Sequence, residues 1–193
     1  MVTPFYQCVR TWIANTNDVN WAYYMGGGWE RWAQGGICIS LMQKPNVPWA
    51  RCEVLAYTNT QRADIAFKDK VSGQDHWDIV ELKCCKRWED KSESLYTFLS
   101  STRVGEDVQT VMQTPLNQGF MGNSRTKWAI GLFALRDVRE YFGDFTLDMA
   151  AGLLRVQTAF PQLRYKDNTG NFVQVPATYV SCERTIFMVY YSV

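Results

Sequence analysis

Histidine is nearly absent from this chain of 193 residues, in which His76 is the single example. Catalysis by paired histidines, histidine-rich metal clusters and H-E-x-x-H peptidase motifs each need more than one histidine, so these chemistries are excluded. The six cysteines contain no C-x-x-C pair, and a zinc finger is excluded with them. The sequence also lacks a G-x-x-x-x-G-K-S/T phosphate loop and a G-x-S-x-G serine motif. Hydrolytic chemistry in this protein therefore has to depend on carboxylates, lysine and a metal ion.

Long hydrophobic runs and an excess of one charge are also missing. No segment approaches the ~18 consecutive apolar residues of a membrane span, and the N-terminus lacks the order of a signal peptide. Lys and Arg number 20 against 19 Asp and Glu, which gives a net charge of +1, so a nucleic-acid surface has to be a local patch. A chain of this size does not need a disulfide framework, so reduced thiols are expected. We expect a protein with no membrane partner that acts inside the cell, in the cytoplasm or the nucleus.

Apolar residues are plentiful, since hydrophobic residues make up 47% of the chain and aromatic residues 15%. This composition is typical of a chain that folds around a buried core. No segment repeats with a period of about 20 to 50 residues, and no segment has the low complexity of a linker. We therefore expect a single domain that spans residues 1–193.

Apolar spacing along the N-terminal part predicts two helices, the first from Thr3 to about Thr16. The second begins at Trp29 and ends before Pro45. β-Branched and aromatic residues then predict a meander of three strands, at 54–58, 62–67 and 77–83. Later patterns predict helices at 95–99, 107–116 and 138–142, and strands at 128–135, 172–175 and 185–191. The predicted fold class is α/β, with a central mixed β-sheet flanked by helices.

Three charged residues on the second and third of these strands are expected to converge. Side chains alternate between the two faces of a strand, so Glu81 and Lys83 share a face, and strand pairing can set Asp64 beside Glu81. Two neighbouring carboxylates repel each other and are stabilised by a shared divalent cation, and Mg²⁺ is typically held by one or two carboxylates with water and phosphate. A lysine beside them can orient or help to deprotonate the attacking water. These residue types together indicate metal-dependent hydrolysis of a phosphodiester.

The same residues resemble a known signature. Asp64, then 16 intervening residues, then Glu81-Leu82-Lys83 on an apolar strand is similar to the core motif of the PD-(D/E)XK nucleases, the restriction-endonuclease-like superfamily. Ala63 stands where the motif's name has proline, which is a common substitution in that family.

Three further features agree with the family in their order along the chain. Glu30 lies on an upstream helix, where many members place an auxiliary metal or water ligand. Gln109 and Gln113 lie on a helix after the E-x-K strand, where several branches place a polar residue that faces the site. The apolar strand at 128–135 follows, as the central sheet of the family requires. The resemblance covers roughly residues 28–135.

The resemblance implies a restriction-endonuclease-like core with an N-terminal helix and C-terminal additions, and a divalent-metal-dependent nuclease that acts on DNA rather than RNA. It implies that Asp64 and Glu81 bind Mg²⁺ or Mn²⁺, with Glu30 as an auxiliary ligand. It further implies that Lys83 serves the attacking water and that Gln109 faces the site. The residues alone leave simpler interpretations open, because Glu81 and Lys83 also suit an amphipathic edge strand, and Glu30 and Gln109 suit solvated helix surfaces.

Basic residues that flank the expected site suit contacts with phosphates. They are Lys86, Arg87, Arg103, Arg125 and Lys127. The solvated rims of helices would explain the same residues. Two rival functions also stay open: a catalytically inactive module of nuclease fold that binds nucleic acid or a protein partner, and an unrelated α/β interaction protein. A homodimer is a further open possibility, because family members that cut both strands often dimerise.

Overall fold

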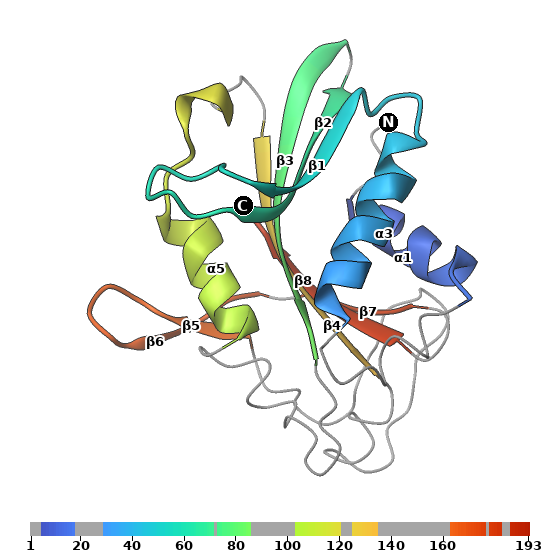
Figure 1. Cartoon of the computed structure of the whole chain (residues 1–193). Helices are drawn as coiled ribbons and strands as arrows, with labels where there is room; N and C mark the ends of the chain where they lie inside the picture. Colours follow the sequence, from blue (N-terminus) through green and yellow to red (C-terminus); the bar gives the residue numbers. More distant parts are fainter. Residues whose placement is uncertain are drawn as a thin grey trace.

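A computed structural model describes residues 5–17, 29–71, 73–85, 103–120, 125–134, 163–176, 178–182 and 186–193 (Figure 1). The helices expected at 95–99 and 138–142 lie outside the described residues. The described elements are α1 (Phe5–Asn15), α3 (Glu30–Met42), β1 (Trp49–Val54), β2 (Ala63–Val71), β3 (Gln74–Cys84), α5 (Val104–Gln113), the 3₁₀ turn η1 (Gln118–Phe120), β4 (Arg125–Ala134), β5 (Arg164–Lys166), β6 (Phe172–Gln174), β7 (Thr178–Ser181) and β8 (Ile186–Ser192). Among these helices, none is both long enough and apolar enough to span a membrane.

Six of the described strands form one mixed sheet in the order β1-β2-β3-β4-β8-β7. β3 and β4 are parallel, and the other neighbours in this sheet are antiparallel. β5 and β6 form a separate two-stranded hairpin. The expected α/β class, with a central mixed sheet flanked by helices, is therefore confirmed.

The two N-terminal helices form where apolar spacing predicted them. α3 buries a stripe of side chains that recurs every three or four residues, and α1 packs beside it. Gly36 lies where the two helices meet, because a Cβ atom there would come within 2.4 Å of Nε1 of Trp12. Glycine at this position thus allows the close approach of α1 and α3.

The meander of β1, β2 and β3 is antiparallel, as expected, but its hairpin is longer than the sequence suggested. The polar connection expected at 68–76 is strand almost throughout, and it turns at Gly73, where φ is +81°. Lys68 and Lys70 both pair with Asp75 across this hairpin, at 2.5 and 2.6 Å. Such cross-strand ion pairs favour strand structure in a segment that is too polar to predict it by periodicity.

The first strand of the meander lies at 49–54 and not at 54–58 as predicted. The reason is pairing with β2, which extends from Trp49 to Val54, whereas the chain after Val54 leaves the sheet edge. Tyr57 then forms an isolated bridge with Leu116 and packs over one face of the sheet. The β-forming residues at 54–58 therefore belong to a covering segment and not to the sheet.

β4 lies inside the sheet between β3 and β8, as the apolar run at 128–135 predicted. β6 and β8 likewise confirm the late strands expected near 172–175 and 185–191. β5 and β7 were not predicted, because three and four residues are too few to show a hydrophobic period.

The two faces of the sheet are covered by different helices (Figure 1). α1 and α3 pack on the face that carries Val80, Leu82 and Cys84, and together they form the main hydrophobic core. α5 packs against β3 and β4 on the other face, the face of Glu81 and Lys83. The charged residues predicted for the site thus point away from the main core.

Candidate functional site

Asp64 and Glu81 lie opposite each other on neighbouring strands. The β2–β3 register pairs Ile65 with Val80, and continuing it by one residue sets Asp64 opposite Glu81. Both side chains thus lie on the same sheet face, and the charge of Asp64 adds to the rise in the pKa of Glu81 that burial causes. The juxtaposition expected from strand pairing is therefore present.

The Asp64 carboxylate is held by two hydrogen bonds from the protein. Its Oδ2 accepts a bond of 2.6 Å from the backbone N–H of Leu82, and its Oδ1 accepts one of 2.7 Å from Nε2 of Gln34 on α3. Burial raises the pKa of Asp64 to about 6, although the Leu82 N–H and the charge of Lys83 oppose this shift. The two hydrogen bonds thus fix the orientation of the Asp64 carboxylate.

Glu81 and Asp107 each have one buried carboxylate oxygen without a hydrogen-bond partner among the described residues. In Glu81 this oxygen is Oε1, and the side chain is buried, with 4% of the residue exposed. Burial raises the pKa of Glu81 to about 9, and the charges of Asp107 and Asp64 add to the shift. The Tyr57 hydroxyl interacts with this carboxyl and opposes the rise of its pKa. A buried carboxyl beside two other carboxylates is stabilised either by a proton or by a cation.

Lys83 lies between carboxylates from two helices. Its Nζ is 3.5 Å from Oε1 of Glu30 on α3 and 3.7 Å from Oδ1 of Asp107 on α5. Burial alone would lower the pKa of Lys83, but the surrounding carboxylates, Asp107 and Glu30 first, raise it above its ordinary value. Lys83 is therefore a cation throughout the physiological range. Glu30 also accepts a hydrogen bond of 3.2 Å from the backbone N–H of Cys84, which ties α3 to the end of β3.

Two members of the site, Asp107 and Gln34, were missed in the sequence. Each is a buried polar residue on the apolar stripe of its helix. Asp107 follows Val104 at helical spacing and precedes Val111, so it faces the sheet as they do. A polar residue inside an apolar stripe is the sequence signal that could have identified both residues.

Gln109 is not brought to the carboxylates. Its Nε2 donates to Oε1 of Gln113 at 3.3 Å, whereas the residue of α5 that contacts Lys83 is Asp107. Positions 107 and 109 lie on different sides of a helix with 3.6 residues per turn. α5 therefore contributes an acid to the site where the sequence suggested an amide.

Three of the five basic residues expected around the site lie in the described part of the chain, and none of the three forms a hydrogen bond or ion pair there with Asp64, Glu81 or Lys83. Arg125 and Lys127 lie on β4 opposite Trp77 and Ile79, on the site's sheet face but nearer the hairpin end. Arg103 lies in the turn that precedes α5. The remaining two, Lys86 and Arg87, lie outside the described residues.

The carboxylates of Asp64 and Glu81 are the candidate ligands for a divalent cation. Within the described residues, no group of three or more His, Cys, Asp or Glu side chains is arranged to hold a metal ion. Mg²⁺ usually needs fewer protein ligands, because one or two carboxylates act together with water and substrate phosphate. Asp64 and Glu81 supply such a pair, and the unpartnered Oε1 of Glu81 leaves a buried acceptor for a cation. The residues present therefore fit Mg²⁺ or Mn²⁺.

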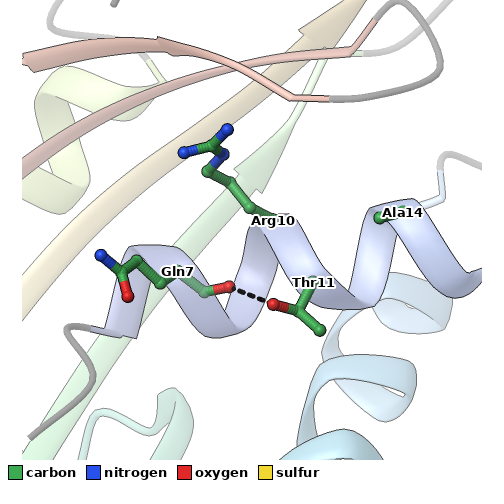
Figure 2. Close-up of a pocket in the computed structure, with 4 residues that line it drawn as sticks. All are labelled: Gln7, Arg10, Thr11 and Ala14. Atoms are coloured by element: carbon green, nitrogen blue, oxygen red, sulfur yellow. Dashed lines mark hydrogen bonds between the residues drawn. The ribbon is translucent and has the colours of Figure 1, made fainter. Parts of the chain in front are cut away.

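A surface hollow on α1 is a poorer candidate for a site. Figure 2 shows its lining residues, Gln7, Arg10, Thr11 and Ala14, along one side of the helix. The Thr11 hydroxyl donates to the Gln7 carbonyl at 2.9 Å, which is an ordinary bond within a helix. The hollow lies on the helix that covers the opposite face of the sheet from Glu81, and its lining has no acid or nucleophile pair.

Comparison of the chain with protein-family models, with curated proteins and with solved structures found no match. The function of this chain therefore has to be inferred from its own residues.

Proposed function

We propose that the protein is a divalent-metal-dependent nuclease of the restriction-endonuclease-like fold that hydrolyses phosphodiester bonds, in DNA rather than RNA. The observation that carries this proposal is the meeting of Asp64, Glu81 and Lys83 on one sheet face, with a buried and unpartnered oxygen on Glu81. Buried polar groups are nearly always satisfied, so such an exception calls for a ligand or a function.

The order of the elements along the chain also supports the proposal. α3 contributes Glu30, the meander contributes Asp64 and the Glu81–Lys83 pair, and the parallel strand β4 follows after α5. This is the order that the nuclease resemblance calls for. An amphipathic edge strand does not explain these residues, since β3 lies between β2 and β4 in the sheet.

Each side chain has a definite task in the proposed reaction. Asp64, fixed by Leu82 and Gln34, and Glu81 would hold the cation, with Glu30 close by as an auxiliary group. Mg²⁺ or Mn²⁺, when bound, neutralises phosphate charge and activates water. The Asp64–Glu81 pair would thereby fix where the scissile phosphate binds.

Lys83 would act as an electrostatic stabiliser. Because its pKa is raised, its ammonium stays protonated and cannot serve as a general base at neutral pH. It can instead orient the attacking water and stabilise negative charge that develops on the phosphate. This assigns Lys83 the more limited of the two tasks considered from the sequence.

The test combines metal binding with cleavage. Mn²⁺ is titrated calorimetrically into the wild-type protein and into Asp64→Asn, Glu81→Gln and Lys83→Met. Each protein is then incubated with linear, circular and single-stranded DNA and with RNA. We expect cleavage to fall at least about 100-fold in all three variants, because each removes charge from the reacting centre. Metal binding should be lost in the two acid variants and retained in Lys83→Met.

Asp75→Asn is the matched control, since Asp75 is an acid on the same strand that is paired with lysines at the hairpin. It should cleave as the wild type does. Cleavage retained in all three site variants would refute the proposal. Absence of Mn²⁺ binding and of cleavage in the wild type would favour the catalytically inactive module.

A further inference from the structure

Three aromatic rings form a row at the hairpin end of the sheet face that carries the site. The rings of Trp49 and Trp77 have centroids 5.3 Å apart, and those of Trp77 and Phe120 are 4.9 Å apart, both in edge-on geometry. Trp77 shares its face with Glu81 through strand alternation. All three side chains are partly buried, and Trp49 and Phe120 pack at the edge of the small hydrophobic cluster around Tyr57, so part of each ring remains at the surface.

Two cations lie over these rings. The Arg51 guanidinium is 5.6 Å from the ring centroid of Trp49, and the Lys68 ammonium is 5.7 Å from that of Trp77. Arg51 and Trp49 are two residues apart on β1, and Lys68 pairs with Trp77 in the sheet, so the four residues share one face. The aromatic row is thus bordered by the positive charge of Arg51 on the β1 side, whereas the charge of Lys68 is shared with Asp75.

Two more cations border the row on the β4 side. Arg125 is paired with Trp77 in the sheet, and Lys127 lies two residues further along β4. Within the described part of the chain, no acidic side chain forms an ion pair with Arg51, Arg125 or Lys127. Burial, together with the charge of Arg125, lowers the pKa of Lys127. Cations held close to each other without acidic partners are stabilised by an anionic ligand.

We propose that this surface, formed by Trp49, Trp77, Phe120 and the four flanking cations, is a platform that binds single-stranded nucleic acid. The inference rests on the proposed function. It adds that the nucleic acid is single-stranded and that it binds on this part of the sheet face. Unpaired bases stack on exposed aromatic rings, while basic side chains contact the phosphates between them. In a duplex the bases are stacked on each other, so they are not available to stack on aromatic side chains.

The platform lies within reach of the carboxylates. Trp77 and Glu81 are four positions apart on β3, which corresponds to about 13 Å along the strand. The segment with Tyr57 and Leu116 crosses the face between them. This segment continues from the end of the edge strand β1, and the platform and the carboxylates lie on the same sheet face, on either side of it.

The test measures binding without cleavage. A fluorescently labelled 12-nucleotide oligothymidylate is titrated, in EDTA, into the full chain carrying Glu81→Gln. Further variants add Trp77→Ala, Trp77→Phe or the double change Arg125→Ala and Lys127→Ala. Trp77→Ala should weaken binding about fivefold or more, because one base loses the ring on which it stacks. Trp77→Phe should weaken binding less, because the base can still stack on the smaller phenyl ring. The double variant should reduce the slope of log K against log salt by about 1.4, since two phosphate contacts are lost and each contributes ~0.7 on a single strand.

Lys166→Ala, on β5 of the separate two-stranded sheet, is the control and should bind as the parent does. Circular dichroism identifies a Trp77→Ala variant that fails to fold, and in that case Trp77→Phe and the basic double variant decide the question. Unchanged binding in both of these would overturn the platform. Equal binding of a 12-base-pair duplex, or equal competition by polyglutamate, would overturn its specificity for single strands. Binding without any cleavage in the wild type would keep the platform and refute the nuclease, whereas cleavage without an effect of these variants would do the reverse.

Discussion

Two buried acids on β3, three residues apart, face opposite sides of the sheet and have opposite surroundings. Asp78 is 5% exposed, and its Oδ1 accepts a hydrogen bond of 2.7 Å from Nε1 of Trp128. Its Oδ2 lies 3.5 Å from Nε2 of His76. Glu81 is as deeply buried, yet its Oε1 has no hydrogen-bond partner in the described part of the chain. The two acids are therefore equally buried, but only the Asp78 carboxylate has hydrogen-bond or ion-pair partners for both of its oxygens.

The difference shows which face is built for stability. On the Asp78 side, α1 and α3 close an apolar core in which the few buried polar groups are paired. On the Glu81 side, Asp64, Asp107 and Lys83 lie close to Glu81. Burial raises the pKa values of the three acids, Asp64, Glu81 and Asp107. A folded protein keeps such an arrangement at a cost in free energy, which the proposed cation would offset.

The largest effect is expected from the apolar face. Leu82→Ala removes a fully buried side chain between the two charged residues of β3 and leaves a cavity in the main core. The free energy of unfolding should fall by about 2–5 kcal/mol, as measured by urea denaturation. Metal affinity of the folded fraction should stay near that of the wild type. A loss below 1 kcal/mol would mean that this face is not the stabilising one.

Neutralising the two acids of β3 should change stability in opposite directions. Asp78→Asn weakens a charge-assisted hydrogen bond to Trp128 and should lower the free energy of unfolding by about 1–2 kcal/mol. Glu81→Gln removes a buried group whose ionisation is disfavoured, so the metal-free variant should be more stable than wild type by at least about 1 kcal/mol at pH 8. Thermal unfolding in EDTA measures both changes.

The pH dependence of Glu81→Gln follows from the raised pKa. Both states of the wild type are protonated at Glu81 below the ordinary pKa of about 4.5, so this residue costs no stability there. As the pH rises from there to about 9, the unfolded state ionises first, and wild-type stability falls relative to the variant. The gap should be absent near pH 4 and largest above pH 9. A gap that widens toward low pH would contradict the assigned shift.

The sequence predicts the contrast between the faces only in part. Strand alternation is a local property, so it correctly separated Glu81 and Lys83 from Leu82 and identified Asp64 as their neighbour. Asp107 reaches the site through the packing of α5 on the sheet, which depends on contacts distant in sequence. The position of β1 was wrong for the same reason, because pairing with β2 decides it. Local patterns thus indicated the strands of the site and the helix at 107–116, but not the residue of that helix that contacts Lys83.

A smaller effect is expected when the charge on α5 is removed. Asp107 lies 3.7 Å from Lys83 and shares this ammonium with Glu30, so Asp107→Asn leaves one of the two carboxylates in place. If Lys83 assists cleavage, kcat should fall about tenfold, equivalent to ~1.4 kcal/mol, with little change in Mn²⁺ affinity. Glu106→Gln, at the exposed neighbouring position, is the control and should leave kcat unchanged. Loss of Mn²⁺ binding in Asp107→Asn would show instead that Asp107 is a metal ligand.

The smallest effect concerns backbone strain on the same side of the molecule. Glu53 has a φ of +54°, and continuation of the β1–β2 register sets it opposite Asp64. Its carbonyl accepts a hydrogen bond of 2.7 Å from Arg62, which helps to keep the backbone in this conformation. Glycine adopts positive φ without a steric penalty, so Glu53→Gly should raise the free energy of unfolding by about 1 kcal/mol and Tm by about 2–4 °C.

Glu53→Gln separates strain from charge, because it removes the carboxylate that adds to the raised pKa of Asp64 but keeps the side chain at positive φ. It should leave Tm within about 1 °C of the wild type, since an exposed charge contributes little. An equal rise of Tm in both variants would assign the cost to charge repulsion and not to the backbone. If Glu53→Gly is more stable but cleaves more slowly, the strained residue helps to hold Asp64 in place, and the cost in stability belongs to the site.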